Sequence, residues 1–298
     1  MSRGFITIAT GKEHYYRIAA NLLLSYRYFS ADPEPFAIIA DRKNQYTDLF
    51  DQVIIMEDPC FSYVDKLRLP EYVPFDETIF IDADSLAYKD LNDYWGLFQD
   101  ADTFSCFGRN YPLDYKYGWF QKEDMGIYQE RVRYIPDFVG GVYYLRKTDD
   151  LAGFYELVKH IITTYHDYRF RQFEDVCDEP VYALAMSVCD FRTVGEKSPD
   201  ICFYPHNTYF ESDITAGKVN YSSMYLKERG IIPEAYMVHW GTGNTYRLPY
   251  LLEEYRLHRI CAGKTVSQTG VKTKELMIKT KKLAGKAYRK VRQWKKQP

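Results

Sequence analysis

Two carboxylates one residue apart follow a short hydrophobic segment in the first third of the chain. Residues 78–82 read Thr-Ile-Phe-Ile-Asp, and Asp82 and Asp84 flank a single alanine. Side chains at alternate positions of an extended chain point to the same side, so both carboxylates face one place. Hard cations such as Mg²⁺ and Mn²⁺ prefer oxygen ligands. We therefore predict that Asp82 and Asp84 hold a divalent cation, the alternative being that they only cap a loop or helix.

A histidine late in the chain supplies a third candidate ligand. His239 stands where the hydrophobic segment 236–240 runs into a turn that contains Gly241. Imidazole binds ions of the Mn²⁺ type, and the amides of such a turn bind phosphate. A single histidine at this place is more often structural. Taken together with Asp82 and Asp84, however, it predicts a metal site with three protein ligands.

Two further acids and one lysine are candidate catalytic groups. Asp178 and Glu179 come just before an apolar stretch at 181–186 that is typical of a helix. Acids at a helix N-terminus complement the helix dipole, which is the ordinary explanation for them. The functional interpretation is that they face a sugar. Lys66, in the segment Tyr-Val-Asp-Lys-Leu-Arg-Leu, is either solvated or neutralises a leaving diphosphate.

The elements that must position these residues alternate in type. We expect strands at 4–9, 36–40, 52–56, 78–82, 138–146 and 236–240, and helices at 12–29, 45–50, 149–166, 178–189 and 249–261. This alternation favours an α/β fold with a mostly parallel sheet. Ligands of such sheets bind beyond the carboxyl ends of the strands, where Asp41, Asp82 and Asp84 stand. The tyrosine-rich segment 108–136 predicts a long ordered loop, a lid or an acceptor wall.

Composition limits the class of protein. The chain has 298 residues, 46% hydrophobic and 27% charged, which excludes a disordered chain, a collagen and a coiled-coil rod. No run of about 18 apolar residues predicts a spanning helix, and the N-terminus does not read as a signal peptide. The six cysteines form no Cys-x-x-Cys pair, which indicates reduced thiols in a cytosolic protein and no zinc-cysteine site.

The charge is divided unevenly along the chain. Residues 263–298 carry 12 Lys/Arg and one acid, a net charge of +11, so a total of −2 leaves −13 for residues 1–262. From about residue 270 the tail predicts a basic amphipathic helix, whose apolar face would hold Leu276, Met277, Leu283, Ala284, Ala287, Tyr288, Val291 and Trp294. We expect it to attach the protein to an anionic membrane on its cytoplasmic face, unless it is only a solvated extension. The acidic body argues against a nucleic-acid partner.

Six segments in this order resemble glycosyltransferases of the family 8 type, which have the GT-A fold and include glycogenin and lipopolysaccharide galactosyltransferases. The resemblance covers roughly residues 4–247. The segment FITIATGKEHYYRIAANLLLSYR resembles the family's first strand and helix, VDKLRL its lysine-bearing segment, and FIDADSL its Asp-x-Asp motif. The segment FVGGVYYLRK resembles the family's Gly-Val strand, DVCDEPVYA its Asp-x-x-Asp-Gln segment, and VHWGTGN its histidine–glycine element.

The resemblance implies a fold and a reaction. It implies a single GT-A domain at 1–262 with a mixed, mostly parallel sheet, followed by the tail at 263–298. It also implies a retaining transferase that moves a hexose from a UDP-sugar, with Mn²⁺ or Mg²⁺, to a hydroxyl of a glycan or lipid-linked acceptor. Such enzymes work in cell-surface polysaccharide or lipopolysaccharide assembly. The alternatives are a non-catalytic module that binds nucleotide-sugar or glycan and, less favoured, a phosphatase with an Asp-x-Asp motif.

The resemblance also implies roles for residues of this chain. Asp82, Asp84 and His239 would hold the metal, and Asp178 and Glu179 would face the donor sugar, Glu179 near the anomeric carbon. The remaining positions would bind the UDP-sugar: Thr10, Tyr15 or Tyr16, Asp41, Lys66, Asp82, Gly140, Gly141 and Gly241.

The sequence departs from the family pattern in four places. Gly11 follows Thr10 where the family has Asn, and Val139 replaces an Asn in the Gly-Val strand. Glu179 replaces the family's Gln, and a carboxylate there is able to act as a nucleophile. The family's lysine after the histidine–glycine element is missing, with Asn244 or Arg247 as the candidate substitutes.

Overall fold

A mixed sheet forms the centre of the molecule in this computed structural model, which describes residues 1–171, 174–195, 200–224 and 227–294. Within these residues, six strands pair in the order β3-β2-β1-β4-β7-β6. They are β1 (Arg3–Ala9), β2 (Phe36–Ala40), β3 (Gln52–Ile55), β4 (Glu77–Ile81), β6 (Phe104–Tyr111) and β7 (Ile135–Arg146). The first four strands run parallel, and β7 pairs antiparallel with both β4 and β6. The predicted mixed, mostly parallel sheet is confirmed.

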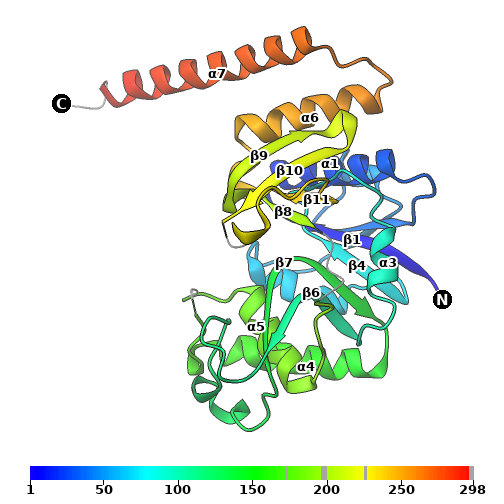
Figure 1. Ribbon diagram of the computed structural model, residues 1–298, viewed down its shortest axis with the longest axis vertical. Helices are drawn as coiled ribbons and strands as arrows, with labels where there is room; N and C mark the ends of the chain where they lie inside the picture. The colour runs from blue at the N-terminus through cyan, green and yellow to red at the C-terminus, as the bar shows by residue number, and fades with distance from the viewer. Residues whose placement is uncertain (172–173, 196–199, 225–226, 295–298) are drawn as a thin grey trace.

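Helices cover both faces of this sheet (Figure 1). Helices α1 (Glu13–Phe29) and α3 (Asp93–Leu97) lie on one face, and α4 (Asp149–Thr163) and α5 (Asp178–Cys189) on the other. Successive residues of β4 show the division, since Ile79 and Ile81 join the core with α1 while Phe80 joins the core with α5. Burial on both sides explains why β2 is an unbroken apolar run with all its residues buried.

A smaller sheet and a hairpin flank the central sheet on the α1 side. The smaller sheet has the order β5-β11-β8, formed by β5 (Ser85–Ala87), β11 (Met237–His239) and β8 (Ile201–Phe203). The hairpin pairs β9 (Asn207–Asp213) with β10 (Lys218–Ser223). A third core lies between these strands and the helices α1 and α6 (Leu248–Cys261), with Trp240 and Tyr250 at its centre. Of these five strands only β11 was predicted.

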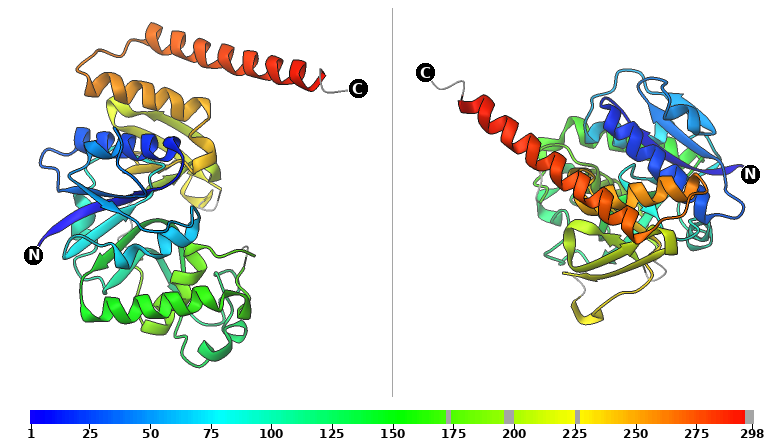
Figure 2. Two further views of the ribbon diagram at one scale, coloured as in Figure 1. Left: turned by 180° about the vertical axis from the view of Figure 1, so that it is seen from behind. Right: turned by 90° about the horizontal axis from the view of Figure 1, so that it is seen from above.

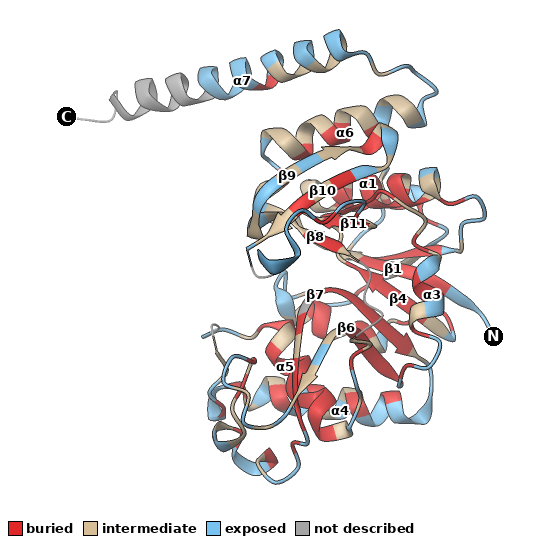
Figure 3. Ribbon diagram, viewed as in Figure 1, coloured by how far each residue is buried: buried red, intermediate tan, exposed pale blue. Residues whose placement is uncertain are grey.

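Local structure differs from the sequence expectation in two places. The helix expected at 45–50 is a 3-10 turn at Thr47–Leu49. The segment expected as loop at 108–136 is partly strand, because β6 extends to Tyr111 and β7 begins at Ile135. Between these strands the chain makes two 3-10 turns, Lys122–Asp124 and Gly126–Tyr128. Figure 3 shows that burial concentrates in the central sheet, while this segment is mixed.

The basic tail forms helix α7 (Gln268–Trp294), which lies across the outer side of α6 (Figures 1 and 2). Ile278 is buried, and the Lys274 ammonium lies 5.5 Å from the centre of the Tyr255 ring on α6. Three apolar side chains of the same helix are exposed: Leu276, Met277 and Leu283. Side chains beyond residue 284, including Ala287, Tyr288, Val291 and Trp294 of the predicted apolar face, lie outside the described residues. Among the described residues, no helix is long and apolar enough to span a membrane.

Candidate active site

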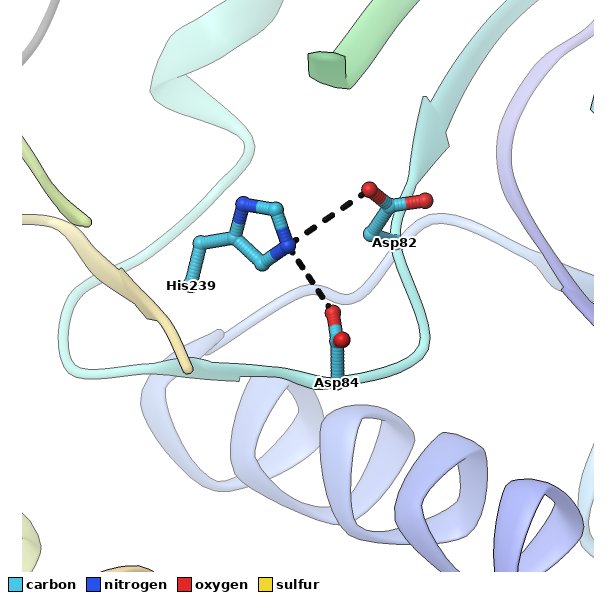
Figure 4. Close-up of side chains that lie close together, drawn as sticks. All are labelled: Asp82, Asp84 and His239. Atoms are coloured by element: carbon cyan, nitrogen blue, oxygen red, sulfur yellow. Dashed lines mark ion pairs between the residues drawn. The ribbon is translucent and has the colours of Figure 1, made fainter. Parts of the chain in front are cut away.

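Strand pairing brings the three predicted metal ligands together. Asp82 directly follows β4, and Asp84 directly precedes β5. Strand β11 runs antiparallel to β5 with His239 opposite Ser85. The imidazole Nε2 therefore lies 3.0 Å from Asp84 Oδ1 and 3.6 Å from Asp82 Oδ2 (Figure 4). The closeness of Asp84 to His239 thus follows from the short sheet that the sequence did not predict.

The residues at this place fit a divalent cation. Among the described residues, Asp84 Oδ1 is buried with no hydrogen-bond partner apart from the ion pair with His239 Nε2 at 3.0 Å, and His239 Nδ1 is buried without a partner. Asp84 Oδ2 accepts a hydrogen bond from Thr242 Oγ1 at 2.9 Å, which fixes the carboxylate. A cation would take the place of the imidazole proton between these side chains, because a metal binds histidine in its neutral form. Two carboxylates and an imidazole are a ligand set that suits Mn²⁺ or Mg²⁺.

The charges of this group shift the acid strengths of its members. Burial raises the pKa of Asp82. Burial would also raise the pKa of Asp84, but the His239 imidazole beside it holds that pKa below its usual value. Burial would lower the pKa of His239, but the Asp84 charge raises it. Without a cation, the imidazole therefore tends to carry the positive charge that the two carboxylates require.

Lys66 lies between this group and a second pair of acids. It belongs to α2 (Tyr63–Leu67) and is only 8% exposed, so it is not the solvated lysine of a surface helix. Its Nζ lies 3.0 Å from Asp82 Oδ2 and 2.7 Å from Asp178 Oδ2. Burial would lower the pKa of this lysine, but the two carboxylates raise it well above the usual value. Lys66 is therefore a buried cation at the centre of the site.

The second pair of acids occupies the first turn of α5. Asp178 Oδ2 accepts a hydrogen bond from the Tyr143 hydroxyl at 2.5 Å, in addition to its contact with Lys66. Burial would raise the pKa of Asp178, but Lys66 lowers it. Glu179 accepts two hydrogen bonds: one on Oε1 from the Gly140 amide at 3.3 Å, and one on Oε2 from the Cys177 thiol at 3.0 Å. Burial and the Asp178 charge raise the pKa of Glu179.

Two glycines of β7 leave the space between these acids open. A Cβ at Gly140 would lie 2.8 Å from Asp178 Oδ2, and a Cβ at Gly141 would lie 3.1 Å from His239 Nδ1. The Gly141 carbonyl also accepts the Asp82 amide at 2.9 Å. The predicted Gly140 and Gly141 therefore lie within the site, at positions where a side chain would fill it. Gly241 begins the turn after β11 with a φ of 68°, a conformation that glycine adopts easily.

Predicted nucleotide residues lie at the carboxyl ends of β1 and β2. Asp41 Oδ1 accepts hydrogen bonds from the Gly11 amide at 2.9 Å and from the Tyr16 hydroxyl, and Asp41 Oδ2 contacts Arg42 at 2.7 Å. The Thr10 hydroxyl donates to Asp65 at 3.3 Å.

The two tyrosines proposed at this end are placed differently. Tyr16 is the one that contacts Asp41, whereas Tyr15 is a partly buried ring that packs against the hydrophobic cores and lies edge-on to His14. Asp41 and the adjoining turn after β1 thus form one hydrogen-bonded unit.

Sequence reasoning missed four residues that support the site. Tyr143, Cys177 and Thr242 hold Asp178, Glu179 and Asp84 through the contacts given above, and Asp65 holds the turn after β1. Tyr143 stands three residues after Gly140, and Cys177 directly precedes the acids, so proximity to the motifs was the only available signal. Of the candidates for the missing lysine, Asn244 donates to the Trp240 carbonyl at 2.8 Å and Arg247 is exposed at the start of α6. The Val139 side chain lies outside the described residues.

Comparison with known proteins shows the fold. No family model matches the chain, and no curated protein matches it in sequence. The chain is similar to a structure of an active-site mutant of LgtC, with a TM-score of 0.50, 14% identity, and coverage of 90% of this chain and 99% of that chain. It is also similar to the galactosyltransferase LgtC bound to donor and acceptor sugar analogues (TM-score 0.49, 12% identity, 91% and 99% covered).

A further similar structure is the apo form of the glycosyltransferase GlyE from Streptococcus pneumoniae (TM-score 0.40, 14% identity). The similar region covers 65% of this chain and 45% of the GlyE chain. The similarity to the LgtC mutant, together with the mixed central sheet, confirms the expected GT-A fold.

Proposed function

We propose that this chain is a metal-dependent retaining glycosyltransferase of the family 8 type that uses a UDP-hexose. One observation supports this most strongly: Asp82, Asp84 and His239 meet at the carboxyl end of β4 and are joined through Lys66 to Asp178. Such an edge is where α/β sheets bind ligands. The LgtC structures, one of them named a complex with donor and acceptor sugar analogues, share this fold and suggest the same class of substrates.

The residues divide the work as follows. Asp82, Asp84 and His239 would hold a Mn²⁺ or Mg²⁺ ion, which when bound would supply positive charge to the donor diphosphate. Lys66 adds a fixed positive charge that stabilises the departing UDP. Asp178 binds hydroxyls of the donor sugar, and the glycines at 140 and 141 let that sugar approach the backbone. Thr10, Tyr15 or Tyr16, Asp41 and Gly241 bind the rest of the nucleotide.

Two routes lead to retention at the anomeric carbon. In the first, the acceptor hydroxyl attacks from the face that UDP leaves, and the leaving diphosphate takes its proton. In the second, a Glu179 oxygen bonds to the anomeric carbon as the bond to UDP breaks. The acceptor hydroxyl then attacks that carbon, the bond to Glu179 breaks, and the hydroxyl proton passes to the UDP diphosphate. The Gly140 amide and the Cys177 thiol hold the Glu179 carboxylate by both oxygens, which orients it for either role.

Calorimetry with UDP, with and without Mn²⁺, tests the donor half of the proposal. We expect tight binding that requires Mn²⁺ and is lost in Asp84→Ala, while the circular dichroism spectrum of the variant stays that of the folded protein. UDP binding that is indifferent to metal, or transfer by Asp84→Ala, would contradict the assignment. UDP release on addition of acceptor then separates the enzyme from a non-catalytic module with the same fold.

The acceptor side of the proposal involves the tail. We propose a glycan or lipid-linked acceptor of cell-surface polysaccharide or lipopolysaccharide assembly, reached by a protein attached to the cytoplasmic face of an anionic membrane. Exposed Leu276, Met277 and Leu283 beside the lysines of α7 support this attachment, because apolar and basic residues on one helix bind anionic lipid surfaces. Co-sedimentation with vesicles should require anionic lipid and disappear on deletion of residues 263–298. Equal binding without the tail would contradict it.

A further inference from the structure

The loop after β3 presents an aromatic ring to solvent in an unfavourable backbone conformation. Phe61 is 62% exposed, and its φ is 55°. Asp58 in the same loop has a φ of 50°. A positive φ is unusual for a bulky residue and persists only where the surroundings impose it. An exposed ring gives no burial energy in return, so packing alone does not explain this arrangement.

A buried carboxylate imposes the conformation of this loop. Asp65 is buried and accepts the Cys60 amide at 2.6 Å on Oδ1 and the Phe61 amide at 2.8 Å on Oδ2. The Thr10 hydroxyl donates to the same Oδ2 at 3.3 Å. One carboxylate thus ties the loop after β3 to the turn after β1. The loop is fixed in place before any ligand arrives.

The Phe61 ring lies against the turn after β1. A Cβ added to Gly11 would lie 2.9 Å from the Phe61 ring carbon Cδ1. Gly11 has a φ of 80°, so this contact and the backbone both require glycine there. The departure at Gly11 from the family's Asn thus makes room for an aromatic ring.

The order of the strands indicates what the ring faces. Strand β1 lies between β2 and β4, and the candidate metal ligands follow β4. A nucleotide whose diphosphate lies at the end of β4 must extend its nucleoside along the sheet edge, over the ends of β1 and β2. The Phe61 ring stands at the end of β1, on the path of that nucleoside.

We infer that Phe61 is the stacking surface for the nucleobase of the donor. This inference rests on the proposed function, since it needs a nucleotide in the site. Aromatic rings stack on every base, so Phe61 contributes affinity without choosing the base. Choice among bases falls to polar groups beside it, such as the Arg42 guanidinium, which contacts Asp41 and the Gly11 carbonyl.

Calorimetry with four variants tests this role. In Phe61→Ala, the affinity for UDP with Mn²⁺ should fall on the order of ten-fold, the usual effect of removing a stacked ring. Phe61→Tyr should bind as the wild type does. The control is Tyr28→Ala, which removes another exposed aromatic ring, at the far end of α1, and should leave the affinity unchanged. Phe61→Gly should lose affinity as Phe61→Ala does and melt at a higher temperature, because glycine relieves the positive φ.

A fluorescent variant reads the stacking directly. In Phe61→Trp, UDP with Mn²⁺ should quench the emission more than it does in the wild type, which has four other tryptophans. Inorganic pyrophosphate with Mn²⁺ occupies the diphosphate site without a base and should cause no such quenching. Equal quenching by pyrophosphate, or none by UDP, would overturn the inference.

The outcomes separate this inference from the proposed function. If the wild type binds no UDP in the presence of Mn²⁺, the proposed function fails and the inference fails with it. If the wild type and Phe61→Ala bind UDP equally, only the inference fails. If UDP affinity is unchanged but the acceptor KM rises in Phe61→Ala, the ring belongs to the acceptor site and the nucleobase assignment is overturned.

Discussion

Two groups of acidic side chains in this site have similar composition but are neutralised differently. Asp82, Asp84 and His239 form one group, and Cys177, Asp178 and Glu179 form the other, each with its possible ligand atoms within 4.8 Å of one another. The second group has its partners in the protein: Lys66 and Tyr143 contact Asp178, while Gly140 and Cys177 contact Glu179. In the first group, Asp84 Oδ1 is buried, and among the described residues it has no hydrogen-bond partner apart from the ion pair with His239 Nε2.

The difference shows which group is built for an ion. The thiol of the second group is a soft ligand and donates to Glu179, so its atoms are occupied within the protein. The first group has hard oxygens, and the cations that face them are a titratable imidazole and Lys66, which it shares with Asp178. We therefore expect the first group to depend on an external cation and the second on Lys66.

Removal of Lys66 should cause the largest loss of unfolding free energy, because this lysine forms ion pairs with an acid of each group. Lys66→Met keeps the side-chain length but leaves Asp82 and Asp178 buried without their cation. Breaking a buried ion pair in this way costs about 3–5 kcal/mol of unfolding free energy. Urea denaturation measures the loss. The control is Lys89→Met, which removes a lysine paired with Glu234 at the surface (2.9 Å) and should cost less than about 1 kcal/mol. Equal losses of unfolding free energy in the two variants would show that the buried ion pairs of Lys66 stabilise the protein no more than a surface ion pair does.

Added Mn²⁺ should stabilise the folded protein by binding to the first group, without involving the second group. At a free concentration of 100 times its Kd, a ligand of the native state adds about 2.7 kcal/mol to the unfolding free energy. A thermal shift assay should show this gain in the wild type and in Glu179→Gln, but not in Asp84→Asn. A gain that survives in Asp84→Asn and disappears in Glu179→Gln would place the ion in the second group.

Much of this fold was readable from the sequence, because the information was local. The strands β1, β2, β3 and β4 are short apolar runs that end in turn or acidic residues, and both the run of residues 78–81 and the acids after it were identified correctly. The position of β11 and its terminal His239 was also predicted. In each case one segment carries its own signal: β2 is apolar and buried throughout, as strands covered on both faces are, and β3 is a short apolar run although none of its residues is fully buried.

The supporting contacts were not readable, because they join segments far apart in the chain. Strand β5 is only Ser85–Ala87, too short for any pattern, yet its pairing with β11 brings Asp84 to His239. Lys66 reads as a surface lysine in its own segment, and its burial depends on acids 16 and 112 residues away. Such charge balance exists only after the sheet has formed.

Thr242 should affect the Mn²⁺ affinity of the first group by a smaller amount. Its hydroxyl donates to Asp84 Oδ2 at 2.9 Å and so orients the other oxygen of that carboxylate, which faces His239 Nε2. Thr242→Val keeps the shape but removes the hydrogen bond, and we expect the Mn²⁺ affinity to fall about 10-fold, at the low end of the effect of outer contacts on metal sites. Thr242→Ser should restore it. Calorimetric titration with Mn²⁺ measures both, and an unchanged affinity in Thr242→Val would mean that Asp84 needs no such support.

Glu179→Gln should change the unfolding free energy least of these substitutions. The sign of that change shows whether the Glu179 carboxylate of the second group destabilises or stabilises the folded protein. Burial and the Asp178 charge raise the pKa of Glu179 above its usual 4.5, so the folded protein holds a proton that the unfolded chain releases. The resulting penalty is absent below pH 4.5, grows as the pH rises toward the raised pKa, and is complete above it. Glu179→Gln removes the titrating group, so the variant should be more stable than the wild type at pH 8, by about 0.5–2 kcal/mol, the usual size of a stabilising substitution.

The pH profile of this difference is the decisive measurement. Urea denaturation of the wild type and of Glu179→Gln should give unfolding free energies that diverge between pH 4.5 and pH 8. Transfer activity should be lost in the variant if Glu179 is the nucleophile and kept if the acceptor hydroxyl attacks directly. Cys177→Ala serves as the matched control, because it removes the thiol that donates to Glu179 and should widen the pH-dependent penalty instead of relieving it. A variant Glu179→Gln that is less stable than the wild type at pH 8 would show that the carboxylate is held there by favourable contacts. The second group would then be a structural ion cluster, and the catalytic assignment of Glu179 would lose its physical support.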